Sequence, residues 1–196
     1  MLLPLNHNYL FPFPSLKMTT KLFEDAPHEV RRLALFIHNF QKESDRGASL
    51  MAGSVIDEVL KEIIAGFLIN KKESLRLLDG FNAPLGTFSS RILAAYCLGL
   101  VEKHEYKELE ILRRIRNAFG HTWSDIDFSN PKISALVRQL PTKDTNLRSK
   151  YHNSVANLLG ELIYRHHEVS QSRRKLKSWP KKYGFIKRNR KSKSET

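Results

Sequence analysis

Apolar residues recur at intervals of three and four along most of the chain, which is the pattern of amphipathic helices. The broadest apolar face belongs to residues 47–70, so this helix is expected to be central. Pro27 suits the first turn of a helix that starts at residue 26. The helices are expected over residues 26–44, 47–70, about 87–99, about 103–119, about 129–140 and 144–171.

Turn-forming residues separate these segments. Residues 78–86 contain Gly80, Pro84 and Gly86 and are predicted to form an irregular loop, and Gly120 is a natural helix stop. No run of β-branched residues alternates with polar ones anywhere in the sequence. The pattern therefore predicts an all-α, up-and-down bundle of about five to seven helices.

A chain of 196 residues suits one ordinary domain with appendages. We expect a non-globular N-terminal extension over residues 1–25, a helical domain over 26–171 and a disordered basic tail over 172–196. Because Met18 could be the initiator in place of Met1, we assign no function to residues 1–17.

Composition narrows the class of protein. The 41% hydrophobic and 27% charged residues are typical of a soluble globular chain, and no apolar run is long enough to insert into a membrane. The single cysteine, Cys97, lies in an apolar run and is interpreted as a small core residue in a reducing, cytoplasmic compartment.

Histidines and carboxylates do not occur at metal-ligand spacing, so we expect no metal and no cofactor. The acidic residues Asp57, Glu58 and Glu62 share one helix face and are interpreted as a solvated surface with ion pairs.

The end of the helix over 103–119 combines residues with distinct chemistry. Arg116 and Asn117 fall in its last turn, and His121 follows the terminating glycine. A guanidinium binds phosphate in two-point contact, and an imidazole transfers protons near neutral pH. Arg116 and His121, with Asn117, are therefore candidate catalytic residues for metal-independent RNA cleavage.

The stretch from Arg116 to His121 resembles the RNxxxH signature of the HEPN superfamily, whose helical-bundle domains end a core helix with this motif. Residues 83–92 and 95–100 closely resemble the mannitol operon repressor family, which shares that fold, and residues 127–131 add to the likeness. The resemblance spans about residues 45–165 and is strongest over 78–121.

The resemblance implies two different functions. Catalytic HEPN proteins are homodimers whose paired Arg and His residues cut RNA, often together with an antitoxin. Proteins similar to the mannitol repressor are named as transcriptional regulators, and the alternative is a non-catalytic corepressor or interaction module that acts through a partner regulator. No predicted helix carries the Arg, Asn and Gln pattern of a base-reading helix, so direct operator recognition by the bundle is not expected.

Other interpretations of the same residues stay open. Arg116 could cap its own helix or pair with Asp125 or Asp127. Arg91 could have a purely structural role as a bridge between helices. The motif could also bind another phosphate or ligand without cleaving it.

The basic character of the chain belongs to its tail. Of the net charge of +13, residues 172–196 contribute eleven Lys and Arg against one Glu, a balance of +10. Cations attract phosphates, and interleaved aromatic rings can stack on unpaired bases, so RNA or DNA is the expected partner. A solvated terminus without a dedicated partner is the alternative, and an anionic membrane surface or an acidic antitoxin would satisfy the same charges. The candidate contact residues are Arg173, Arg174, Lys175, Lys177, Trp179, Lys181, Lys182, Tyr183, Lys187, Arg188, Arg190 and Lys191.

Overall fold

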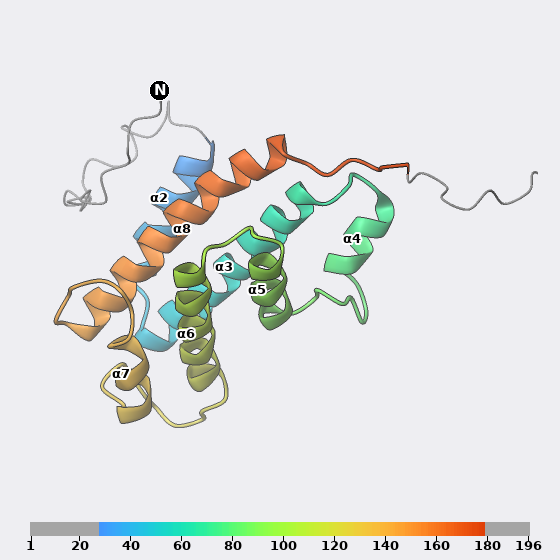
Figure 1. Cartoon of the computed structure of the whole chain (residues 1–196). Coiled ribbons are helices and arrows are strands. Elements are labelled where there is room, and N and C mark those ends of the chain that lie inside the picture. Colours follow the sequence, from blue (N-terminus) through green and yellow to red (C-terminus); the bar gives the residue numbers. More distant parts are fainter. Residues whose placement is uncertain (1–27, 179–196) are drawn as a thin grey trace, which may run out of the picture.

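Helices make up all of the regular secondary structure over residues 28–178, the part of the chain that this computed structural model describes (Figure 1). This confirms the all-α prediction. The helices within these residues are α2 (His28–Phe40), α3 (Asp45–Phe67), α4 (Lys72–Leu78), α5 (Phe88–Cys97), α6 (Lys103–Gly120), α7 (Pro131–Val137) and α8 (Leu147–Gln171). None of them is both long enough and apolar enough to cross a membrane.

Helix α3 is the centre of the bundle, as its broad apolar face predicts. It contacts α8, α6, α5, α2 and α4, and Figure 1 shows α5 and α6 side by side across it. Its side chains Ile56, Leu60 and Ile63 are fully buried. Because these helices pack on it from several sides, α3 forms the shared core of the bundle.

Local capping explains where several helices begin. Ser44 accepts a hydrogen bond from the backbone N–H of Gly47 at the start of α3, and Thr87 forms a reciprocal capping box with Ser90 at the start of α5. Asn130 caps α7, which has a proline in its first turn. The sequence offers Thr87 or Ser89 as the restart of this helix, and the structure shows that Thr87 is the N-cap.

Most helix ends lie within three residues of the expected positions, and two differences are larger. The first helix ends at Phe40 instead of residue 44, since Ser44 caps the next helix. Helix α4 was not predicted at all. It has only seven residues and no side-chain cap, so it offers too few turns for an apolar period and lacks a start signal.

The interpretation of Cys97 as a core residue is wrong, because the cysteine is exposed. It lies on the side of α5 opposite to Ile92 and Ala95, which are buried. Leu93 and Tyr96 in the same apolar run are exposed as well. An unbroken apolar run on a short helix does not reveal which side faces the core.

The segment after α6 is held against the bundle by an aromatic cluster. The Phe128 ring lies 5.6 Å from that of Phe119 and 4.8 Å from that of Tyr151, measured between ring centroids. The backbone N–H of Phe128 donates to Asp45 Oδ2 at 2.9 Å. These contacts hold Phe128, seven residues after the candidate His121, against α3 and α8.

A candidate site at the end of helix α6

Arg116 lies where α6 packs most closely on α3. Its side chain is half-buried, and a Cβ atom added to Gly53 of α3 would lie 2.8 Å from Arg116 Cγ. No real Cβ approaches a carbon atom so closely without something shifting. The glycine therefore makes room for the Arg116 stem, which holds that side chain in place.

Further contacts show that α3 and α6 run antiparallel. Arg46 donates to the carbonyl oxygen of Ser124 at 2.6 Å, just beyond the end of α6. Leu50, one turn further along α3, faces Gly120, and Gly53 faces Arg116. One stripe of α3 thus positions the whole carboxyl end of α6.

Asp57 is half-buried and forms an ion pair with Arg91. Arg91 Nη1 lies 2.8 Å from Asp57 Oδ1, and the same guanidinium donates to the carbonyl oxygens of Leu78 and Leu85 at 2.9 Å each. Burial raises the pKa of the Asp57 carboxyl above its ordinary value, while the paired Arg91 guanidinium, and more weakly the charge of Arg116, oppose the rise. Arg91 bridges helices, and its donors are directed at α3, α4 and the loop before α5.

The acidic face of α3 is partly what the sequence predicts. Glu58 pairs with Lys61 and Glu62 pairs with Arg32 on an accessible surface. Asp57 differs, because it is half-buried beside Arg91. Its pairing with Arg91 joins residues 34 positions apart, and no local spacing signal reports such a contact.

Asn117 and His121 complete the predicted motif. Asn117 Oδ1 accepts a hydrogen bond from Arg116 Nη1 at 3.1 Å, and the backbone N–H of His121 donates to the Asn117 carbonyl at 3.0 Å. The imidazole of His121 is exposed at the helix end. No hydrogen bond among the described residues joins the side chains of Arg116 and His121, which lie roughly 140° apart around the helix axis at about 100° per residue.

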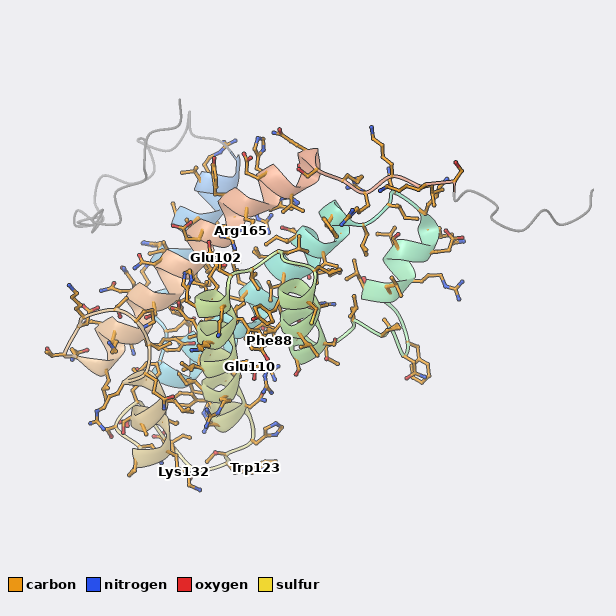
Figure 2. All side chains as sticks on the ribbon, in the orientation of Figure 1. Phe88, Glu102, Glu110, Trp123, Lys132 and Arg165 are labelled. Carbon is orange, nitrogen blue, oxygen red and sulfur yellow. The ribbon has the colours of Figure 1, made fainter. Side chains whose placement is uncertain are left out.

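The alternative pairing of Arg116 with Asp125 or Asp127 is not present among the described ion pairs. Asp127 instead accepts hydrogen bonds from the backbone N–H and the hydroxyl of Ser129, which lower its pKa. Trp123, labelled beyond the end of α6 in Figure 2, is fully exposed. The helix end is therefore open to solvent on the side of His121.

Four of the predicted tail residues fall within the described part of the chain. Arg173, Arg174, Lys175 and Lys177 are all exposed. Arg174 also contacts the bundle: its backbone N–H donates to the Phe67 carbonyl at 2.9 Å, and its guanidinium lies 4.9 Å above the Phe67 ring. The remaining predicted residues lie outside the described range; they are Trp179, Lys181, Lys182, Tyr183, Lys187, Arg188, Arg190 and Lys191.

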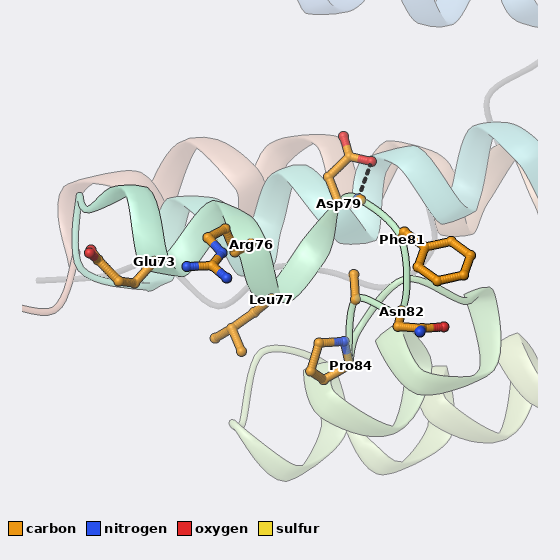
Figure 3. A pocket seen from close by; sticks show the side chains of 9 residues that line it. Glu73, Arg76, Leu77, Asp79, Phe81, Asn82 and Pro84 are labelled. Carbon is orange, nitrogen blue, oxygen red and sulfur yellow. Dashed lines mark hydrogen bonds between the residues drawn. The ribbon is translucent and has the colours of Figure 1, made fainter.

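Two hollows lie away from this helix end. One, of about 540 Å³, is formed by α4 and the following loop and is lined by charged and apolar side chains that include Arg76, Asp79 and Phe81 (Figure 3). The other, of about 400 Å³, is a mainly apolar groove between α2, α3 and α8. Residues 28–178 contain no group of three His, Cys, Asp or Glu side chains that could hold a metal ion.

Comparison with solved structures identifies a fold of the same kind. The X-ray structure of the MtlR–HPr complex from Escherichia coli matches with a TM-score of 0.50 and 18% identity, covering 70% of this chain and 98% of that one. In fold, this chain is similar to MtlR. At 18% identity the match shows a similar fold and assigns no role to individual residues of this chain.

Comparison of sequences finds a similarity to mannitol operon repressors over a shorter span. The chain is 35% identical over 57 residues to the mannitol operon repressors of Escherichia coli strains K12 and O6:H1 (CFT073). The match spans 29% of this chain and 29% of each repressor. No protein-family profile matches the chain.

Proposed function

We propose that this chain is a regulatory protein similar to the mannitol operon repressor and that it acts by binding a partner protein. One observation carries the proposal: the MtlR of similar fold was solved in a complex with HPr, and this chain covers 98% of that MtlR. The partial sequence match to mannitol operon repressors supports the same regulatory role.

The surface of the bundle suits such a role. Several large apolar side chains are exposed, among them Leu35 on α2, Phe81 after α4 and Leu93 on α5. These side chains lie on separate parts of the bundle, and each could supply an apolar contact to a partner protein. A repressor that acts through another protein needs no base-reading helix, which is consistent with the sequence pattern.

Titration calorimetry with purified HPr tests the proposal. We expect a saturable heat of binding and co-elution of the two proteins on a sizing column. Absence of both heat and co-elution, with both proteins folded, would contradict a role through this partner.

RNA cleavage at the end of α6 is the second candidate, and it includes the assignment to the HEPN superfamily. The observation that favours it is the placement of Arg116, held by Gly53 and bonded to Asn117, at the helix end that exposes His121. In this reaction the ribose 2′-hydroxyl attacks phosphorus and the bond to the 5′-oxygen breaks. Arg116 would stabilise the charge on the phosphate while His121 transfers a proton.

A homodimer would bring together the helix ends of two chains, so that the Arg116 of one copy could act beside the His121 of the other. Mixed RNA incubated with the chain in EDTA should then give fragments that end in cyclic phosphate, and light scattering should report a dimer. Intact RNA or a monomer would count against this second candidate.

A further inference from the structure

The indole of Trp123 is completely exposed beside the candidate active site. It follows His121 by two residues, just beyond the end of α6. Between residues 99 and 163, all of which the structure describes, it is the only exposed large apolar side chain. Both faces of the ring are therefore open to a flat ligand, which an aromatic ring can cover by stacking.

The backbone that carries this indole is held on both sides. The hydroxyl of Thr122 donates to the carbonyl oxygen of Ala118 in α6 at 2.7 Å. The carbonyl oxygen of Ser124 accepts a hydrogen bond from Arg46 of α3 at 2.6 Å. Because both chain neighbours of Trp123 are bonded to the bundle, a ligand that stacks on the ring does not first have to order the chain.

Two guanidiniums accompany the indole. Arg116 lies against Gly53, which follows Arg46 by seven residues on α3, a separation of about 10 Å along that helix. None of the ion pairs within residues 28–178 includes Arg46 or Arg116. Each donates one hydrogen bond to an oxygen of the chain, and a guanidinium carries several donors, so both keep donors for a phosphate.

The remaining charges at this end leave an excess of cations. Lys132 of α7 is exposed, and Figure 2 shows it at the same end of the molecule as Trp123. Asp125 and Asp127 are the acidic residues between α6 and α7, and Asp127 already accepts two hydrogen bonds from Ser129. Lys132 and the two guanidiniums outnumber these carboxylates, which favours an anionic ligand.

We infer that Trp123 is a base-stacking residue for single-stranded RNA: its indole covers an unpaired base while Arg116 and Arg46 bind phosphates of the same strand. The inference rests on the second candidate function, because it names the strandedness of the RNA and the residue that holds a base beside the candidate active site. Aromatic rings next to cations are the usual combination in proteins that bind single strands.

The isolation of this indole favours a base over a protein surface. Protein interfaces concentrate their binding energy in clusters of apolar and aromatic side chains that exclude water. Trp123 has no exposed large apolar neighbour on α6, on α7 or in the segment between them. A single ring suffices for a base, provided that the base is unpaired, because the bases of a duplex already stack on one another.

Tryptophan fluorescence tests the inference directly. Trp123 and Trp179 are the only tryptophans in the sequence, so the full chain with Trp179→Phe reports on Trp123 alone. The probe is a 2′-O-methyl oligouridylate of about 12 nucleotides, which matches usual single-strand site sizes and resists cleavage because its 2′-hydroxyls are blocked. The single strand should quench the fluorescence of Trp123 in a saturable way, and its duplex with a 2′-O-methyl oligoadenylate should not.

Variants measure how much the stacked base contributes. Trp123→Ala should weaken binding of the labelled probe by about tenfold, measured by fluorescence anisotropy, whereas Trp123→Phe should keep most of the affinity. Tyr164→Ala, at an exposed aromatic residue of α8, is the matched control and should bind as the wild type does. If the chain cuts RNA, Trp123→Ala should raise KM more than it lowers kcat, since a stacked base is bound equally in the ground state and the transition state.

The outcomes separate the inference from the function on which it rests. RNA cleavage with the same KM in the wild type and Trp123→Ala overturns the stacking role and leaves the second candidate function standing. RNA that stays intact while the probe quenches Trp123 contradicts cleavage and supports the stacking site. Absence of quenching, or probe affinity unchanged in Trp123→Ala, overturns the inference and leaves the basic tail as the site of any binding. Loss of HPr binding in Trp123→Ala with unchanged probe affinity would make the indole a protein contact and also overturn the inference.

Discussion

Arg91 is the residue on which the junction of three chain segments depends. Its guanidinium forms an ion pair with Asp57 of α3 and donates hydrogen bonds to carbonyl oxygens at the end of α4 and in the loop before α5, and its side chain is 8% exposed. We expect Arg91→Met to lower the free energy of unfolding by about 2–3 kcal/mol, since it leaves the half-buried Asp57 carboxylate and two carbonyls without their donor. Urea unfolding followed by circular dichroism measures the change.

The double variant Arg91→Met, Asp57→Leu provides the control for that experiment. It should recover part of the lost stability, because no unpaired carboxylate remains. A single variant as stable as the wild type would show that the bonds of Arg91 contribute nothing to the fold.

If the chain cuts RNA, Arg116→Ala and His121→Ala should each reduce the rate by about 10²- to 10⁴-fold, the usual cost of removing such groups. Asn117→Ala should cost less, since an amide carries neither charge nor protons at neutral pH. His104→Ala, an exposed histidine at the other end of α6, is the matched control and should cleave at the wild-type rate. Equal rates in all four variants and the wild type would exclude this helix end as the active site.

Glu108 makes stability depend on pH. Burial, with a smaller effect from the neighbouring Glu105 charge, raises the pKa of Glu108 from 4.5 to about 7. The folded state therefore binds the proton more tightly, so the free energy of unfolding should fall as pH rises from about 4.5 to 7, by at most about 3 kcal/mol. In Glu108→Gln this fall should be absent.

Measuring the difference between the wild type and Glu108→Gln at each pH cancels the other titrating groups. His152 is the main one, because burial lowers its pKa to about 4 and its contribution is lost as pH falls below 6.5. A difference that does not change between pH 5 and pH 8 would contradict a raised pKa at Glu108.

Among single residues, the sequence identified the motif but not its surroundings. The motif is recognisable from the sequence because its residues, Arg116, Asn117 and His121, are neighbours along one helix end. The approach of Gly53 to Arg116 and the pairing of Asp57 with Arg91 depend on the packing of α3 against α6 and α5. Those contacts join residues that are 63 and 34 positions apart, respectively, beyond any local pattern.

At the level of elements, long helices were predicted well and short ones poorly. Helices α3, α6 and α8 each repeat their apolar period over several turns, so their positions follow from the sequence within a few residues. Helix α4 has only seven residues, and its Leu75 and Leu77 are exposed, so neither length nor amphipathicity marks it.

The segment after α8 allows a prediction with two truncations. A chain ending at Gln171 lacks every predicted tail residue, whereas one ending at Ser178 keeps Arg174 on Phe67. Both should stay folded by circular dichroism. If the tail binds single-stranded nucleic acid, the salt slope of binding should fall by about 0.7 for each phosphate that the truncated tail no longer neutralises, and it should fall further in the shorter chain. If the salt slope of binding is identical in both truncations and the full chain, the tail does not contact nucleic acid.

For the whole molecule, the bundle architecture followed from the apolar pattern, while the exposure of individual apolar side chains did not. Leu93 and Tyr96 belong to an apolar run that the sequence suggests is buried, and only the packing of α5 on α3 shows that they are exposed. Their exposure is thus a property of the assembled bundle.

Binding of purified HPr to the full chain is the most direct measurement of the proposed regulatory role. Titration calorimetry should give a saturable heat of binding, and the two proteins should elute together from a sizing column. Neither heat nor co-elution, with both proteins folded by circular dichroism, would contradict the proposed function.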